Sequence, residues 1–330
     1  MLVLAPGALF RSFFDGARQR RLGRSFQWSR SGARTLAAVP RATLAAADAL
    51  VTTWDSPRFA DDALDRAPRV RVIAHCGGEV KGRFATALFE RLSITNAPGP
   101  MAGYVAELAL ATLLYGVRNV DAHRAALRRP SNAVYARIHR DGVGDETLAG
   151  RTVGLFGFGR IGRALALLLQ PLGARVLVHD PFVGAAAVRR AGADPVSWGA
   201  LLDRSRHLVL AAALTEKTRG ILDRRALARL PEGCLIVNVA RGALVDLDAL
   251  TAEVRRGRLR CALDVTDPEP LPPRHPLRRL PGAILTPHVG AAQREVRAAM
   301  ADIVLDDLER FFGGRRPRNR VRAAMLARMT

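Results

Sequence analysis

The sequence predicts an α/β protein of two doubly wound domains, one inserted into the other. Short apolar segments alternate with helical segments along the 330 residues, as in parallel sheets. A glycine-rich turn between a strand and a helix lies at 157–162, near the middle of the chain. A long helix is predicted at the end, over 291–312. This order predicts a central domain with the chain returning to the first domain.

The first hundred residues form an α/β unit of their own. A long amphipathic helix follows over Tyr104–Arg118, and the polar residues 121–150 are predicted to be a loop. The predicted strands of the first unit are Leu2–Leu4, Ala49–Thr52, Val70–Ala74 and Ser93–Thr95, with helices over Ala60–Ala67 and Arg83–Arg91.

From residue 151 onward the strands and helices alternate regularly. The helix after the glycine turn spans Ile161–Leu169 and is closed by Pro171 and Gly173. The predicted strands are Val153–Phe156, Val176–His179, His207–Leu210, Leu235–Val239, Arg260–Asp264 and Ile284–Leu285. Six such strands suit a doubly wound sheet.

The glycine turn predicts a dinucleotide site. Gly157, Gly159 and Gly162 form G-x-G-x-x-G. The first glycine allows the tight turn, the second lets the backbone approach a pyrophosphate, and the third lets the helix pack on the strand. The helix N-terminus offers N–H groups and a positive dipole end to the phosphates. Spaced glycines alone are weak evidence, but here an apolar strand and an apolar helix flank them.

Asp180 ends the next strand, where a carboxylate can accept hydrogen bonds from both ribose hydroxyls. Pro181 and Phe182 follow it, so no arginine stands there to bind a 2′-phosphate. The predicted cofactor is therefore NAD rather than NADP. The predicted fold is an NAD-binding Rossmann domain over residues 101–289, inserted into a flavodoxin-like substrate domain formed by residues 1–100 and 290–330.

The composition excludes several other classes. Cys76, Cys234 and Cys261 are widely spaced and lack a C-x-x-C pair, so we expect no disulfide framework and no metal site. The N-terminus favours a first strand over a signal peptide, and no apolar run is long enough to cross a membrane. These features are typical of a cytoplasmic protein.

The formal net charge is +21. Such a charge attracts polyanions, and nucleic-acid binding is one interpretation. The arginines are scattered, however, and only Arg315, Arg316 and Arg318 form a compact basic run. We favour an arginine-rich composition over a nucleic-acid partner.

Three titratable or charged side chains follow predicted strands of the nucleotide-binding sheet. Arg241 follows one strand and can form two hydrogen bonds to a carboxylate. Glu269 lies in a proline-bounded turn after the next strand, and His288 follows the last. Histidine titrates near neutral pH and suits proton transfer. Because parallel strands bind ligands at their carboxyl ends, these residues are candidates for one catalytic site.

With these motifs, the sequence resembles the D-isomer-specific 2-hydroxyacid dehydrogenase family. The matching segments have the family's order and spacing. They are Gly157–Gly162, Asn238–Gly242, Leu263–Val265 with Pro268–Pro270, and Thr286–Gly290. The resemblance covers roughly residues 70–320 and is strongest over 150–295.

The resemblance implies hydride transfer between NADH and the C2 carbon of a 2-keto acid, giving a D-2-hydroxy acid. His288 would donate the proton, Glu269 would pair with it, and Arg241 would orient the substrate. The resemblance also implies a homodimer. Among cofactor contacts, it assigns the nicotinamide amide to Asp264 and the pyrophosphate to the backbone of Arg160 and Ile161, with Ala240 and Gly290 also beside the cofactor. It assigns the substrate carboxylate to main-chain N–H groups of Gly77 and Gly78.

Two segments depart from the family pattern. The stretch Leu210–Thr215 lacks the usual histidine and proline, which predicts a less polar nicotinamide side. The loop Cys76–Lys81 lacks the usual G-x-G-x-D form, and Glu79 would repel an anionic substrate unless it points away. An NAD-sensing, corepressor-like regulator without turnover is therefore the main alternative to an enzyme, with a nucleic-acid-binding protein as a third.

Overall fold

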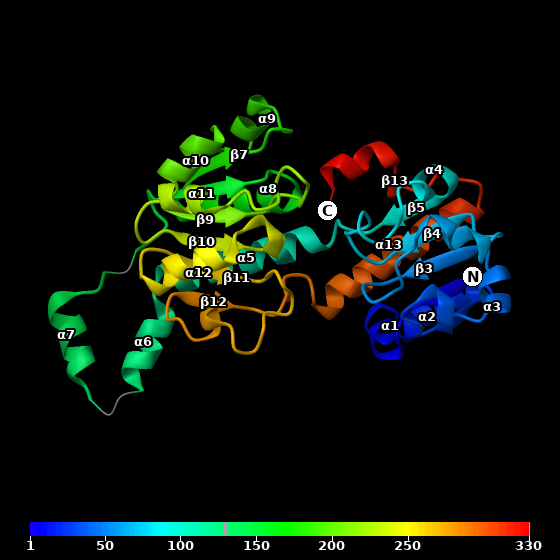
Figure 1. The fold of residues 1–330 in the computed structure, drawn as a ribbon, viewed down its shortest axis with the longest axis horizontal. Helices are drawn as coiled ribbons and strands as arrows, with labels where there is room; N and C mark the ends of the chain where they lie inside the picture. Colours follow the sequence, from blue (N-terminus) through cyan, green and yellow to red (C-terminus); the bar gives the residue numbers. More distant parts are fainter. Residues whose placement is uncertain (129–130, 145, 330) are drawn as a thin grey trace. The chain divides into compact units, whose positions relative to one another are not determined.

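The computed structural model describes residues 1–128, 131–144 and 146–329 (Figure 1). The chain divides into two compact units. Unit 1 comprises Met1–Met101 and Ala291–Thr330, and unit 2 comprises Ala102–Gly290. Unit 1 is therefore made of two chain segments that flank unit 2 in sequence.

Unit 1 is built on a six-stranded sheet whose order is β13-β5-β4-β3-β1-β2. The five strands from the N-terminal segment are parallel and have the flavodoxin-like order, and β13 pairs antiparallel with β5. The strands are β1 (Leu2–Leu4), β2 (Ser29–Ser31), β3 (Ala49–Thr52), β4 (Val72–His75), β5 (Ser93–Asn96) and β13 (Arg320–Val321). Strand β13 thus joins the C-terminal segment to this sheet.

The helices of unit 1 are shorter than predicted in its first segment, and the last helix ends at the predicted residue but begins three residues later, at Arg294. The helix predicted over 60–67 is a single 3₁₀ turn at Asp61–Asp65, and that over 83–91 is helical only at its end. The α-helices are α1 (Gly7–Phe13), α2 (Gly16–Ser25), α3 (Arg41–Ala45), α4 (Leu88–Arg91) and α13 (Arg294–Phe312). Helix α13 packs on α1 and β4 through buried side chains that include Val304 and Leu308.

Unit 2 is built on a seven-stranded parallel sheet whose order is β12-β11-β10-β9-β6-β7-β8. Strands β6 and β9 are neighbours although β7 and β8 lie between them in sequence, so the strand order reverses between them. The strands are β6 (Thr152–Phe156), β7 (Arg175–His179), β8 (Asp194–Pro195), β9 (His207–Leu210), β10 (Leu235–Asn238), β11 (Arg260–Leu263) and β12 (Ala283–Leu285). This is the Rossmann order, and the predicted fold class is confirmed.

Helices cover the unit 2 sheet through apolar side chains. Leu208, Ile236 and Leu263 are almost fully buried beside Leu227 and Leu250 of two covering helices. At about 25 cal/mol per Å², such burial is the main driving force for forming this layer. The helices are α5 (Met101–Val117), α8 (Arg160–Leu169), α9 (Ala185–Arg190), α10 (Trp198–Arg204), α11 (Arg224–Arg229) and α12 (Leu247–Arg255).

The prediction of a loop over 121–150 is wrong for 121–127 and 133–141, holds for 142–144 and 146–150, and at 129, 130 and 145 lies outside the described residues. This stretch contains most of α6 (Val120–Leu127) and all of α7 (Ala133–Asp141), which lie away from the sheet in Figure 1. Neither helix has a buried residue, although Val134 and Ile138 lie one turn apart on α7 and line one hollow. Their alanines and arginines are good helix formers. The loop prediction relied on the polar composition of the stretch and did not take this helix propensity into account.

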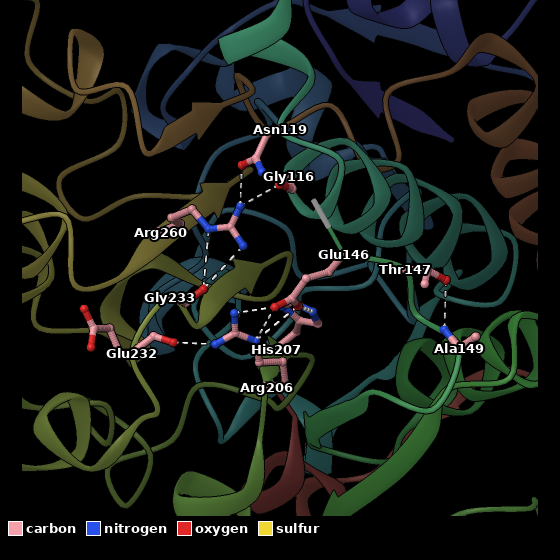
Figure 2. A network of polar contacts seen from close by, with 10 residues as sticks. All are labelled: Gly116, Asn119, Glu146, Thr147, Ala149, Arg206, His207, Glu232, Gly233 and Arg260. Atoms are coloured by element: carbon pink, nitrogen blue, oxygen red, sulfur yellow. Dashed lines mark hydrogen bonds and ion pairs between the residues drawn. The ribbon is translucent and has the colours of Figure 1, made fainter. Parts of the chain in front are cut away.

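Ionic contacts hold the amino-terminal edge of the unit 2 sheet (Figure 2). Arg206, just before β9, forms an ion pair with Glu146, with Nε 2.9 Å from Oε1. Arg260, at the start of β11, donates from Nη1 to the Gly116 carbonyl at 2.7 Å and also contacts the Gly233 carbonyl. These contacts tie α5 and the segment before β6 to the sheet edge opposite the candidate site.

No helix in the described part of the chain has the length and apolar character to cross a membrane.

Candidate active site

The structure explains each glycine of the predicted turn. Gly157 has φ +97°, and a Cβ there would lie 2.5 Å from the backbone nitrogen of Ala212. A Cβ on Gly162 would lie 2.2 Å from the Gly157 carbonyl oxygen, so the helix could not approach the strand. A Cβ built on Gly159 would have no atom of the described residues within 4 Å, apart from its chain neighbours and its own helix backbone. This free space at the N-terminus of α8 fits a pyrophosphate group that approaches the backbone.

Asp180 lies beside this turn. Its Oδ2 accepts a hydrogen bond from the Phe158 N–H at 2.7 Å, and its Oδ1 accepts one from the Phe182 N–H at 2.9 Å. The carboxylate is therefore held at the carboxyl end of β7, next to the glycine turn. A ribose beside the pyrophosphate would meet a fixed negative charge at this point.

Arg241 is the third residue after the end of β10, in a turn held by a buried asparagine. Asn238 accepts the Ala240 N–H at 3.0 Å and donates from Nδ2 to the Arg241 carbonyl at 2.9 Å. The side chain of Arg241 is half-buried and donates from Nη1 to the Ala240 carbonyl at 2.7 Å. No role for Asn238 was predicted from the sequence. An asparagine at a strand end, four residues before Gly242, is nevertheless a signal for such a turn.

The loop that carries Glu269 lies directly against the Arg241 turn. A Cβ on Gly242 would lie 2.0 Å from the carbonyl carbon of Thr266, so only glycine fits at this approach. The positive charge of Arg241 contributes to lowering the pKa of Glu269, after the larger effect of the hydrogen bond from His288. The two predicted site residues therefore share one electrostatic environment.

His288 and Glu269 form a close pair. Nδ1 of His288 lies 2.5 Å from Oε1 of Glu269, and both side chains are partly exposed. The hydrogen bond with His288 is the main reason that the pKa of Glu269 is lowered. A carboxylate acceptor assigns the proton on Nδ1, which leaves Nε2 to exchange a proton with a ligand.

His288 adopts the left-handed backbone conformation, with φ +54°, which is uncommon for a residue with a side chain. Asp264 supports this turn with both oxygens. Its Oδ1 accepts hydrogen bonds from Thr286 Oγ1 at 2.6 Å and the Val289 N–H at 2.8 Å, and its Oδ2 accepts the Gly290 N–H at 3.0 Å. The buried Asp264 carboxylate therefore holds the turn that presents His288. These contacts of Asp264 were not predicted from the sequence, because they depend on how the loop after β12 folds toward the end of β11.

The predicted substrate residues Gly77 and Gly78 belong to unit 1, just past β4. A Cβ on Gly77 would lie 2.5 Å from Nε2 of His75 and 3.1 Å from Cδ1 of Trp54. The Gly78 carbonyl accepts a hydrogen bond from Asn96 Nδ2 at 2.9 Å. The glycine loop therefore packs closely on the end of the sheet, with no room for a side chain at Gly77.

The loop's unusual acidic residue has a local partner. Glu79 Oε1 accepts the Gly82 N–H at 2.7 Å, so this carboxylate closes the turn that follows the two glycines. Lys81 is exposed.

Comparison with known proteins identifies the family. The domain description "D-isomer specific 2-hydroxyacid dehydrogenase, NAD binding domain" matches residues 110–290. The chain is 31% identical to a glyoxylate reductase from Korarchaeum cryptofilum, over 83% of this chain and 82% of that protein. The chain belongs to the D-isomer-specific 2-hydroxyacid dehydrogenase family.

Other members of the 2-hydroxyacid dehydrogenase family extend the match. The chain is 35% identical to the D-3-phosphoglycerate dehydrogenase of Mycobacterium leprae over 79% of this chain and 48% of that protein. It spans about half the length of the curated phosphoglycerate dehydrogenases that it matches. The crystal structure of the TT0316 protein from Thermus thermophilus aligns with a TM-score of 0.77 and 33% identity, covering 97% of this chain and 99% of that one. The NAD-binding domain of the family supports NAD(H) as the cofactor.

Proposed function

We propose that this chain is an NAD-dependent oxidoreductase that interconverts a 2-keto acid and a D-2-hydroxy acid. The observation that carries the proposal is the 2.5 Å contact between His288 Nδ1 and Glu269 Oε1. This pair lies past strand ends of the same sheet that carries the glycine turn and Arg241. An acid-base pair beside a dinucleotide site is the arrangement that carbonyl reduction needs.

NADH held at the glycine turn and Asp180 would supply the hydride for C2 of the keto acid. In the same reaction His288 gives the proton on Nε2 to the carbonyl oxygen, so the C=O group becomes CH–OH and the imidazolium becomes neutral imidazole. Glu269 stabilises the imidazolium through Nδ1 and keeps the ring oriented. In the oxidative direction His288 accepts that proton.

Arg241 orients the substrate in this proposal. A guanidinium offers a planar pair of donors that fits a carboxylate and an adjacent carbonyl oxygen. In this proposal the main-chain N–H groups of Gly77 and Gly78 bind the substrate carboxylate, as the family resemblance implies. The Gly77 N–H donates to the His75 carbonyl at 2.9 Å, so it exchanges that acceptor for the substrate. The contact between Glu79 and Gly82 supports this role because it engages the loop's carboxylate within its own turn.

We propose NAD rather than NADP as the preferred cofactor because Asp180 would repel a 2′-phosphate. Ala240, Asp264 and Gly290 remain cofactor contacts in the proposal, and Asp264 has the additional role of holding the His288 turn.

We also propose a homodimer. The helices α6 and α7 support it, because Leu127 and Tyr135 are 70% and 67% exposed on them. Apolar side chains of this size gain stability when a partner covers them.

The test is NADH consumption across a panel of 2-keto acids that includes glyoxylate, hydroxypyruvate, pyruvate and bulkier acids. We expect turnover of at least one of them, with a D-2-hydroxy acid as product by chiral chromatography. Tight NADH binding without turnover of any panel member would contradict the enzyme and favour the NAD-sensing, corepressor-like alternative. Absence of NADH binding would contradict both.

A further inference from the structure

Arg297 and Trp54 form a cation–aromatic pair in unit 1. Arg297 lies on α13, and its Cζ is 4.7 Å from the centre of the Trp54 ring and 5.8 Å from that of Phe13. Trp54 follows β3 and is half-buried. Arg83 holds the Trp54 backbone by donating from Nη2 to its carbonyl at 2.5 Å. Phe13 packs edge-on against the Trp54 ring, with the ring centres 5.2 Å apart, so the ring also has a contact other than Arg297.

Arg297 is unusual because it lacks an acidic partner. Nη1 donates to Ser12 Oγ at 2.8 Å, and Nε is buried without a hydrogen-bond partner. Among the described residues, no carboxylate lies within ion-pair distance of its guanidinium. By contrast, two arginines of α2 in the same unit form ion pairs with carboxylates of α13, Arg18 with Asp302 and Arg21 with Glu309. Burial lowers the pKa of Arg297, and the negative charge of nearby Asp55 offsets only part of this desolvation cost.

The pair adjoins the loop proposed to bind the substrate carboxylate. Cδ1 of Trp54 lies 3.1 Å from the position of a Cβ built on Gly77. The Trp54 ring therefore contacts the glycine loop at one edge and Arg297 over its face. A substrate held by its carboxylate at Gly77 and Gly78 would have the Trp54 ring beside it and, over the face of that ring, a positive charge without an ion-pair partner among the described residues.

We infer that Arg297 and Trp54 are specificity residues that select 2-keto acids with a second anionic group at the end far from the keto acid carboxylate. The inference rests on the proposed function, because it assumes that Gly77 and Gly78 bind that carboxylate. The second group is a carboxylate or a phosphate. Either one supplies the acceptor that the guanidinium lacks, and Arg binds both through planar hydrogen bonds. Trp54 supplies an apolar wall that orients the chain between the two charged ends.

The alternative is that Arg297 only fastens α13 to α1. Its bond to Ser12 and its packing on Phe13 and Trp54 would suffice for that role. A fastening residue affects all substrates equally, whereas a specificity residue affects only those with the distal charge. The two roles therefore separate in a comparison of matched substrates.

The test compares kcat/KM for two matched pairs, oxaloacetate with pyruvate and 3-phosphohydroxypyruvate with hydroxypyruvate. We expect wild type to prefer the charged member of at least one pair by about tenfold or more, and the preferred pair distinguishes carboxylate from phosphate. R297M, which keeps the length of the side chain but not its charge, should lose about tenfold or more on that member and less than about threefold on its partner. R297K should retain part of the preference because it keeps the charge. The exposed Arg20 provides the control R20M, which removes one charge elsewhere in unit 1 and should leave the ratio unchanged.

Equal losses on both members of each pair in R297M, or a wild type that favours the uncharged members, would overturn the inference. If wild type turns over none of the four acids, the proposed function fails on this panel. The inference is then judged by calorimetric binding of the same acids to wild type and R297M in the presence of NAD. Charged-end acids that bind wild type but not R297M would support it, and equal binding to both proteins would overturn it.

Discussion

Asp264 and Gly290 are joined by a hydrogen bond of 3.0 Å between a buried carboxylate oxygen and a backbone N–H. The other oxygen of Asp264 accepts the Val289 N–H and the Thr286 hydroxyl. His288 lies in sequence between Thr286 and Val289 and has a left-handed backbone conformation. Its Nδ1 is 2.5 Å from Oε1 of Glu269. One carboxylate therefore maintains the backbone that directs the proposed proton donor.

Asp264→Asn should lower kcat because an amide presents a donor to N–H groups that need an acceptor. Loss of a hydrogen bond to a charged group costs about 1.5–3 kcal/mol, or roughly 10- to 100-fold in rate if it is lost in the transition state. If Asp264 only bound the cofactor, Asp264→Asn would instead raise the KM for NADH and leave the pH profile of kcat unchanged. Steady-state kinetics over a pH series separates the two roles.

NAD should be preferred over NADP by at least about tenfold in catalytic efficiency, or about 1.4 kcal/mol. The reason is the fixed carboxylate of Asp180 beside the glycine turn. Replacing Asp180 with Ser and the exposed Phe182 with Arg should narrow the gap. Equal efficiency of wild type with both cofactors would show that Asp180 does not face the ribose.

Much of this site was predictable from the sequence because its residues follow strand ends of a parallel sheet. The glycines of the turn and the order of Arg241, Glu269 and His288 are local signals with a physical reason behind each spacing. The role of Asp264 was not predictable, because its partners are backbone groups about 25 residues later whose position depends on the folded loop.

The fold shows the same division between packed and exposed elements. Buried strands such as β3 and β9 match their predicted bounds because burial on both faces gives continuous apolar runs. Helices α6 and α7 were missed because they bury nothing within this chain, and helix propensity alone is a weaker signal than packing periodicity.

Acid should destabilise unit 2 through His207 (Figure 2). Burial lowers the pKa of this histidine to about 4 from its ordinary 6.5, although the charge of Glu146 acts in the opposite direction. Its ring nitrogens form no hydrogen bond among the described residues, and Nε2 lies 3.5 Å from Oε2 of Glu146 (Figure 2). Above pH 6.5 the ring is neutral in both states and contributes no pH dependence. As the pH falls from 6.5 to about 4, only the unfolded chain takes up the proton, so the free energy of unfolding decreases.

His207→Phe should reduce this slope by up to about 1.4 kcal/mol per pH unit, the value for one proton. The measurement is urea unfolding at several pH values in a background with Trp28→Phe and Trp54→Phe, which leaves Trp198 in unit 2 as the only tryptophan. His75→Phe is the control, because this second buried histidine lies in unit 1. Identical slopes for wild type and His207→Phe would show that His207 does not govern the acid sensitivity of unit 2.

Glu269→Gln should move the basic limb of the pH profile for reduction to lower pH by about one unit or more. The hydrogen bond with His288 is the main cause of the lowered pKa of Glu269, so the carboxylate in turn favours the protonated imidazole that reduction consumes. At low pH the loss of activity should be smaller. Superimposed profiles would mean that the two residues are not coupled during turnover.

The central claim is that His288 donates the proton in a reaction that NADH drives. The most direct test measures single-turnover reduction of the best keto acid by His288→Ala at saturating NADH, with the Kd for NADH measured on the same protein. General acid catalysis contributes roughly 10²- to 10⁴-fold, so we predict a loss in that range with NADH affinity within about threefold of wild type. A variant that keeps more than about a tenth of the wild-type rate would fall outside that range and contradict the assignment of His288 as the acid.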